Sequence, residues 1–196
     1  MVPAEPRGYT APELLVTVAV AALVSATTLP VVAGALEFER AQAGARYLAL
    51  RLRDAQLEAL RRGRFVALHV TPGETDTLIR PFLDGDGDGV LMRDVEMGVD
   101  PPLGPAERLG AQAAGVTLRV NQPVVEIDGT GWLATGSDPL RIGRTSLVSF
   151  SPMGSATAGT LYVAAPRGPQ LAVRITGGTG RVRLLRFDPG ASAWRP

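Results

Sequence analysis

Hydrophobic and polar positions form three successive patterns along this chain, and the first is a long apolar run. From Leu14 to Leu36 no residue is charged, and the few polar side chains are hydroxyl groups. A helix of this length spans about 34 Å, which is enough to cross a bilayer hydrocarbon core of about 30 Å. The first pattern therefore predicts a membrane-spanning helix.

The second pattern is an apolar stripe at alternating spacings of three and four residues, which is typical of one face of a helix. Charged residues such as Glu39 and Arg53 fall on other faces. Arg61 and Arg62 suit the carboxyl end of the helix dipole, and Gly63 is a common terminating residue. We therefore expect one helix of about 50 residues, whose second half packs on a sheet. The stripe consists of Phe38, Ala41, Ala45, Leu48, Leu52, Ala55 and Ala59.

The third pattern begins after the helix, where the hydrophobic period changes to two. Val66, Leu68 and Val70 alternate with other residues, which is typical of a β-strand. Similar short runs follow near residues 116–120, 145–150, 159–164, 170–176 and 180–186. Pro and Gly gather between residues 98 and 115, which indicates a loop within one domain. The whole pattern predicts an α+β fold: a long N-terminal helix packed on an antiparallel β-sheet head.

The composition agrees with one apolar segment attached to an ordinary polar head. Mean hydropathy is +0.13 although only 5% of residues are aromatic, and the first apolar run accounts for this. The net charge of +1 argues against nucleic-acid binding through the field of the whole molecule. The absence of Cys excludes disulfides, Cys-ligated metal sites and a thiol nucleophile.

The start of the apolar run carries a motif. Residues 7–16 read RGYTAPELLV, with Glu13 at the beginning of the apolar segment. An ordinary signal peptide does not explain this carboxylate, because a charge in the membrane is costly and requires a partner. The segment resembles the class III leader and cleavage motif of type IV pilins and type II secretion pseudopilins.

That resemblance implies several roles. Cleavage by a prepilin peptidase would follow Gly8, and Tyr9 would become the N-methylated first residue. Glu13 would be the fifth mature residue and would set the register of assembly by pairing with the amino group of a neighbouring subunit. Pro30 would be the helix-bending residue that pilins commonly carry. The sequence departs from the family in having Tyr9 instead of Phe, and Pro12 in the first turn.

The carboxyl-terminal region carries a second resemblance. The segments Phe150–Gly154, Gly159–Val163 and Gly180–Arg183 are similar to the GspH/FimT group of minor pseudopilins and minor pilins. The two resemblances together imply a leader at 1–8, a transmembrane helix half at 9–36, a soluble helix half at 37–63 and a periplasmic head at 64–196.

The implied function is that of a minor pseudopilin, a structural subunit of the type II secretion pseudopilus in the bacterial inner membrane. Its implied partners are other pseudopilins or pilins, the prepilin peptidase, the membrane and secreted cargo. The alternative is a FimT-like minor pilin of a type IV pilus, acting in pilus assembly or DNA uptake. The two differ in partner rather than in fold.

An Asp-Gly repeat is the first candidate for chemistry outside the helix. Asp84, Asp86 and Asp88 alternate with Gly before Val90, as in the first half of a calcium loop. The second half of that motif is missing, since position twelve is Val95. One hypothesis is calcium bound by the three carboxylates and the carbonyl of Val90. The other is a polar hairpin tip without a metal.

A second candidate is a basic strand. Arg181 and Arg183 alternate, so both point to one face, and Arg174 or Arg186 lies near them in our prediction. FimT-like relatives with a basic carboxyl-terminal stretch imply DNA binding here. The alternative is an ordinary solvated strand face, which the shortage of stacking aromatic residues favours.

Catalytic signals are weak. His69 is the only His, and we expect it on the sheet face opposite Val66, Leu68 and Val70 rather than in a catalytic role. Residues 129–134 match a dinucleotide-binding fingerprint by letter, but the following residues do not suit a helix. We therefore expect no enzyme; a calcium-dependent adhesin or a membrane-tethered enzyme is the remote alternative.

Overall fold

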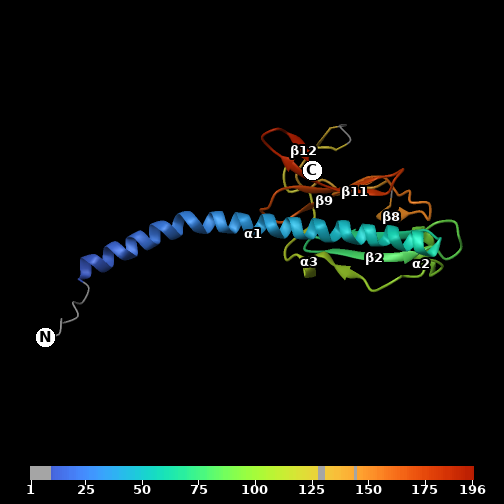
Figure 1. Cartoon of the computed structure of the whole chain (residues 1–196), viewed down its shortest axis with the longest axis horizontal. Helices are drawn as coiled ribbons and strands as arrows, with labels where there is room; N and C mark the ends of the chain where they lie inside the picture. Colours follow the sequence, from blue (N-terminus) through green and yellow to red (C-terminus); the bar gives the residue numbers. More distant parts are fainter. Residues whose placement is uncertain (1–9, 128–130, 144) are drawn as a thin grey trace, which may run out of the picture. The chain divides into compact units, whose positions relative to one another are not determined.

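The computed structural model describes residues 10–127, 131–143 and 145–196, apart from the side chains of residues 27, 29 and 30. The chain divides into two units, residues 1–36 and 37–196. A single helix, α1, runs from Ala11 to Arg62 and belongs to both (Figure 1). The second unit, which we call the head, contains the last part of α1 and the strands.

The part of α1 within the head confirms the predicted stripe. Six of the seven stripe residues are buried, and Phe38 is half-buried. The exposed residues between them include Glu39, Arg46 and Arg53. The helix ends at Arg62 because Gly63 takes a left-handed φ of 64°, a conformation that glycine adopts without a steric penalty.

The first sheet contains the strand predicted directly after the helix. Its order is β3-β2-β1-β8, and β1 is antiparallel to both β2 and β8. Val66 lies opposite Leu83 in the first pair and opposite Phe150 in the second. The strands are β1 (Val66–Pro72), β2 (Thr77–Leu83), β3 (Glu107–Arg108) and β8 (Leu147–Phe150).

The second sheet contains the carboxyl-terminal strands. Its order is β12-β11-β10-β9-β4, with β7 also pairing with β9, and all of these pairs are antiparallel. The strands are β4 (Thr117–Leu118), β7 (Leu140–Arg141), β9 (Gly159–Ala164), β10 (Leu171–Thr176), β11 (Arg181–Asp188) and β12 (Ala193–Arg195).

The remaining elements are short. One of them, α3, lies with β3 in the segment predicted as a loop between residues 98 and 115, so this segment is not wholly irregular. The short elements are α2 (Met92–Met97), α3 (Leu109–Gln112), β5 (Val124–Val125) and β6 (Trp132–Leu133), the last two forming a separate pair.

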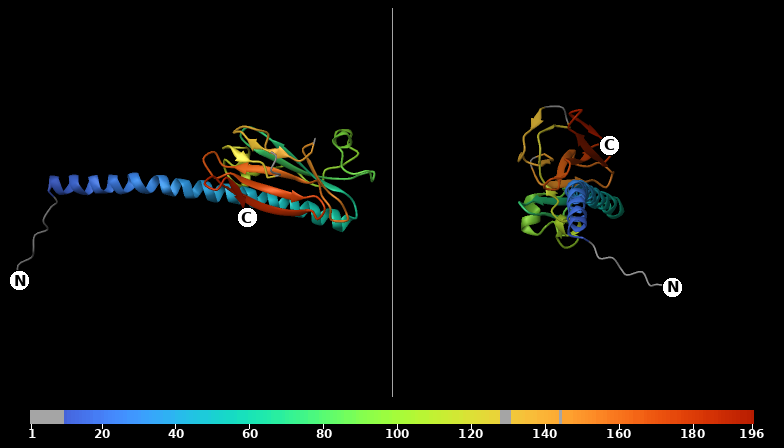
Figure 2. Two further views of the ribbon diagram at one scale, coloured as in Figure 1. Left: turned by 90° about the horizontal axis from the view of Figure 1, so that it is seen from above. Right: turned by 90° about the vertical axis from the view of Figure 1, so that its left-hand side faces the viewer.

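Both sheets pack on the head part of α1. Figures 1 and 2 show β2 on one side of this helix segment and β9 and β11 on the other. The main core joins Leu48 and Leu52 of α1 with Leu68 of β1 and Leu161 of β9, all of them fully buried. Two smaller clusters lie on the opposite faces of the sheets, around Phe82 and around Tyr162, Phe187 and Trp194. The predicted α+β architecture is therefore confirmed.

Candidate assembly surfaces

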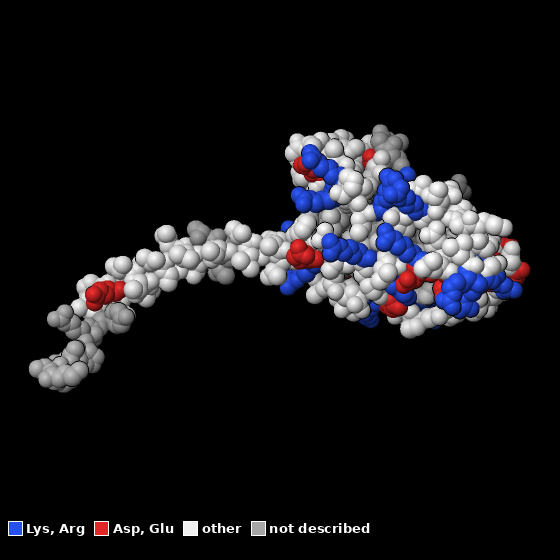
Figure 3. Space-filling view, in the orientation of Figure 1, with Lys and Arg blue, Asp and Glu red and all other residues white. Residues whose placement is uncertain are grey.

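The first part of α1 presents apolar side chains to its surroundings. Leu15, Leu23 and Val31 are each more than two-thirds exposed. In Figure 3 the described atoms of this part of the helix are white except for a red patch near its start, and by sequence Glu13 is the charged residue of this part. By length and composition it is the helix of the described chain that is able to cross a membrane. Such a surface is stable in lipid or against other apolar helices, but not in water.

The structure gives Glu13 a contact that the sequence analysis missed. The backbone N–H and the hydroxyl of Thr10 donate to Glu13 Oε2, at 2.8 and 2.7 Å. Thr10 precedes the first helical residue, so Glu13 serves as the side-chain half of a capping box. Thr three residues before Glu is a sequence signal of this cap. Pro12 fits here because first-turn N–H groups have no helical acceptor.

Three further residues were predicted to act in processing or assembly. Gly8 and Tyr9 lie outside the described residues, and Pro30 lies within α1, which continues through it. Their roles in cleavage, N-methylation and assembly stay predictions.

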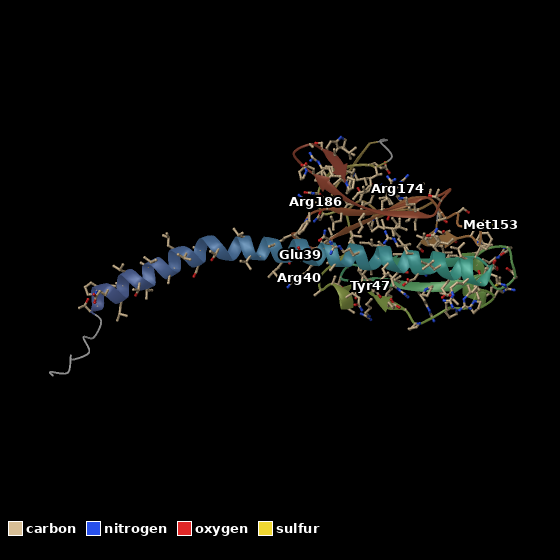
Figure 4. The ribbon with its side chains drawn as sticks, viewed as in Figure 1. Glu39, Arg40, Tyr47, Met153, Arg174 and Arg186 are labelled. Atoms are coloured by element: carbon tan, nitrogen blue, oxygen red, sulfur yellow. The ribbon has the colours of Figure 1, made fainter. Side chains whose placement is uncertain are left out.

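A polar contact fixes the head part of α1 to the first sheet. The hydroxyl of Tyr47 on α1 donates a hydrogen bond to the carboxylate of Glu107 on β3. Figure 4 labels Tyr47 on the helix. Arg51 pairs with Glu107 at 2.8 Å and with Asp54 at 3.1 Å. Burial and the hydrogen bond to Glu107 raise the pKa of Tyr47 to about 12. This cluster holds the helix against an edge strand.

The Asp-Gly segment is not the hairpin tip that was one prediction. It joins β2 to the short helix α2, so no strand follows it directly. Asp84 is buried, and its two carboxylate oxygens accept backbone N–H groups of Gly87 at 2.7 Å and Gly89 at 3.3 Å. The Gly residues thus serve to wrap the loop around Asp84 rather than to turn a hairpin.

Asp100 closes the same loop from fifteen residues away. Its carboxylate is buried and accepts N–H groups from Gly85 at 2.9 Å and Leu91 at 3.0 Å. Asp94 is buried as well and pairs with Arg93 at 3.0 Å. Because the contacts of Asp100 join residues distant in sequence, only a general excess of acidic residues between 84 and 100 signalled them.

The three carboxylates proposed for calcium do converge. One oxygen of each of Asp84, Asp86 and Asp88 lies within 4.8 Å of the others, and the last two residues are exposed. Reduced hydration, a hydrogen bond with Asp86 and the charges of Asp86 and Asp94 raise the pKa of Asp88. Hard cations such as calcium prefer groups of oxygen ligands of this kind. The structure assigns no contact to the carbonyl of Val90, whose side chain is buried.

Arg181 and Arg183 lie where the strand prediction placed them. Both are exposed on β11 with the buried Val182 between them. Arg174 of β10 lies directly opposite Arg183, whereas Arg186 lies on the other face, over the ring of Phe38 at 5.4 Å. Figure 4 labels Arg174 and Arg186 on these two strands. Three of the four candidate arginines therefore share one face.

Of the segments that carried the second resemblance, Gly159–Val163 lies in β9 and residues 181–183 lie in β11, whereas residues 151–154 and Gly180 form tight turns. Ser151 Oγ accepts N–H groups from Met153 at 3.2 Å and Ser155 at 3.1 Å, leaving Met153 at an exposed tip. Gly180, directly before the basic strand, has a φ of 59° and packs against Gln56 of α1 and the carbonyl of Gly154. These residues shape the end of the head and hold α1 against the second sheet.

The rejected catalytic candidates lie in ordinary structure. His69 is half-buried on the predicted face of β1 and contacts Ser146 Oγ at 2.7 Å. Burial lowers its pKa. Within the fingerprint segment, residues 129 and 130 lie outside the described part, and Trp132 and Leu133 form β6. No helix follows them among residues 131–139, so the dinucleotide-site geometry is absent from the described segment.

Comparison with known proteins gives one match. A family model described as Type II transport protein GspH matches residues 44–180. This range includes most of the head part of α1, the Asp-Gly loop and the strands up to the turn at Gly180. The searches found no matching curated protein and no matching solved structure. Since the family model covers well over half of the chain, the protein belongs to the GspH family, a structural pseudopilin family of type II secretion.

Proposed function

We propose that this protein is a minor subunit of the type II secretion pseudopilus. The observation that carries the proposal is the GspH family match joined to a helix whose first part is apolar and exposed. An exposed apolar helix is suited to insertion in a membrane before assembly and to packing against the helices of other subunits after it.

The proposed processing and assembly of the subunit have three steps. A prepilin peptidase cuts after Gly8, and Tyr9 is N-methylated. The chain then waits in the inner membrane with its head in the periplasm. Assembly moves the helix into the pseudopilus, where the carboxylate of Glu13 meets the amino group of a neighbouring Tyr9. A buried carboxylate gains most from such a partner, which is how it would fix the register.

Mass spectrometry of the membrane-extracted protein tests the first step. In cells with active prepilin peptidase, the expected amino-terminal peptide starts at methylated Tyr9. Retention of residues 1–8 would contradict the proposal. Protease treatment of spheroplasts tests orientation, because only a periplasmic head is cut from outside.

The partners are other pseudopilins and, at the tip, secreted cargo. Deletion of the gene would then reduce secretion without removing the other pseudopilins from the membrane. Neighbouring genes for a secretion ATPase, a secretin and further pseudopilins favour this reading. Neighbouring pilus or competence genes would favour the FimT-like alternative, in which the head acts in pilus assembly or DNA uptake.

We further propose that the loop of Asp84, Asp86 and Asp88 binds calcium. The proposal is supported by the convergence of their oxygens and by the exposure of Asp86 and Asp88 to solvent. The contacts of Asp84 with Gly87 and Gly89 hold the loop in a curve that keeps the three carboxylates together. Calcium bound there would stabilise the folded head.

A further inference from the structure

The outer edge of β11 is only partly covered. Residues 181–186 pair with β10 on the inner side, whereas β12 pairs with residues 186–188 on the outer side. Along the outer side of residues 181–185, the described part of the chain supplies no strand. An uncovered strand edge is a site at which an extended segment of another chain can add to a sheet.

The backbone directions show which groups face this open edge. The N–H of Phe187 donates to the carbonyl of Gln170 at 3.0 Å, on the inner side. Because directions alternate along a strand, Val182 and Leu184 face outward. The outward direction of Val182 agrees with a second contact, in which its carbonyl accepts a hydrogen bond of 3.4 Å from Arg53 of α1. Val182 and Leu184 therefore present pairing groups to the edge.

A groove follows this edge between β11 and α1. It encloses about 750 Å³, and its apolar lining consists of Leu57 of α1, of Val182, Leu184 and Leu185 of β11, and of Pro196. Leu57 is 56% exposed, so the groove offers apolar area that the head does not cover. An extended segment lying here would pair with the edge on one side and cover Leu57 on the other.

The charged residues of the groove are all cations. The cationic side chains are those of Arg53, Arg181 and Arg183; no acidic side chain lines the groove, whose other polar side chain is that of Gln56 and whose rim includes Pro196. No carboxylate of the described residues forms an ion pair with any of the three. The groove therefore favours a ligand with negative charge.

The alternation of β11 also sets the pattern of the ligand. Val182 and Leu184 contact the main core on the α1 face, while Arg181 and Arg183 are exposed on the opposite face. Side chains of neighbouring strands point to the same face at paired positions. A strand added here would place acidic residues beside the two arginines and apolar residues beside Leu57.

We propose that residues 181–185 of β11 bind an extended segment of a partner protein, in which acidic and apolar residues alternate. The inference rests on the proposed function in so far as assembly brings a partner chain to this face. Before the partner arrives, Arg53 occupies the Val182 carbonyl and protects the edge from unspecific pairing, as charged residues do at other strand edges. On binding, an N–H group of the partner replaces Arg53.

The test uses the full chain in detergent and fluorescent synthetic peptides of seven residues. The first peptide alternates valine and glutamate, the second has lysine in place of glutamate, and the third has the first composition in two blocks. We expect the first peptide to bind saturably. The affinity of the other two peptides should be lower by about tenfold or more. Fluorescence anisotropy measures each affinity.

Backbone methylation of the first peptide tests strand pairing. In an added strand, only every second N–H of the ligand faces β11. N-methylation of one alternate set should weaken binding by about tenfold or more, whereas methylation of the other set leaves it nearly unchanged. Equal affinity for both methylated peptides and the parent would overturn the proposal, because simple charge attraction would then suffice.

Charge reversal in the protein provides the matched control. The double variant Arg181→Glu with Arg183→Glu should no longer bind the glutamate peptide and should bind the lysine peptide instead. The control is Arg46→Glu with Arg167→Glu, which changes the net charge equally at exposed positions outside the groove. Circular dichroism checks that both variants are folded. Similar losses in both variants would contradict a site on β11.

A single-stranded DNA of twenty nucleotides is the competing ligand. Binding of DNA that depends on Arg181 and Arg183, without peptide binding, would assign the surface to nucleic acid and overturn the proposal. Failure of the peptide to bind at millimolar concentration overturns it as well. Peptide binding by a chain that does not join a pseudopilus would leave this inference standing and contradict the proposed function.

Discussion

Glu13 caps the start of its own helix through Thr10, whose N–H and hydroxyl both donate to Glu13 Oε2. The proposed pairing with a neighbouring subunit requires the same carboxylate. One residue therefore has two tasks, a local one that needs an acceptor oxygen and an intermolecular one that needs a negative charge. Substitution can separate them.

Glu13→Gln should abolish assembly while preserving the helix. The amide oxygen still accepts from Thr10, because Gln serves in a capping box as Glu does. The charge is lost, however, so we expect incorporation into pseudopili to fall by about tenfold or more at unchanged membrane levels. Cross-linking and immunoblotting measure both. Thr10→Ala is the control, which weakens the cap and retains the charge; normal assembly of Glu13→Gln would contradict the charge role.

Gly180→Ala should destabilise the head by about 1–3 kcal/mol. The added methyl group is strained at a φ of 59° and also meets Gln56 and the carbonyl of Gly154. Gly136→Ala is the matched control, since its φ is 82° but nothing lies within 4 Å of the new atom. Chemical denaturation should show the larger loss for Gly180→Ala. Equal losses would mean that backbone strain alone decides.

Leu48→Ala should cost about 2–5 kcal/mol of head stability, because the side chain is fully buried between α1 and the sheets. Leu50→Ala on the same helix is the comparison, since Leu50 is 52% exposed and should lose about 0.5 kcal/mol or less. Urea denaturation of the two variants measures the difference. A large loss of unfolding free energy for Leu50→Ala in the monomer would contradict the exposed position of this side chain.

His69 should make the head less stable in mild acid. Burial lowers the pKa of His69 below its ordinary value of 6.5, so the unfolded chain binds the proton more readily than the folded one. Stability is then lost as the pH falls below about 6.5, until the folded state also binds the proton. The stability advantage of the wild type over His69→Gln should shrink from pH 7.5 to 5. An advantage that stays constant over this range would contradict the lowered pKa.

Calcium should bind the loop of Asp84, Asp86 and Asp88 with a heat detectable by calorimetry. The double variant Asp86→Asn with Asp88→Asn should abolish the heat, because these exposed carboxylates supply the charge. Glu96→Gln is the control, an exposed acid in the following helix. Absence of heat at millimolar calcium in the wild type would refute the site.

The helix and the larger strands were predictable because their signals are local and repeated. Leu48 and Leu52 recur at helical spacing, Gly63 marks the helix end, and Val66 starts a regular alternation. Each signal depends on neighbours within a few residues, so one sequence contains all the information needed. The same holds for the alternation of Arg181 and Arg183 on β11.

The structure of the Asp-Gly loop was harder to predict, because its contacts join residues far apart in the sequence and the helix that follows it is short. Asp100 bonds to Gly85, and the helix after the loop has six residues and no side-chain cap at Leu91. Neither feature produces a periodic pattern. The repeat of Asp and Gly by itself suits a hairpin equally well, so the sequence did not decide between a turn and a wrapped loop. The pairing of Arg174 with Arg183 likewise depends on a register that only the folded sheet defines.

The shared core has a consequence for the order of events at synthesis. Leu48 and Leu52 of α1 are made first, but their partners include Val173 and Val182 near the other end of the chain. The helix can form early, yet its apolar stripe remains uncovered until the last long strand has been delivered. The head is therefore expected to complete its folding only after nearly the whole chain has been translated or translocated, and a chaperone would have to shield α1 during that interval.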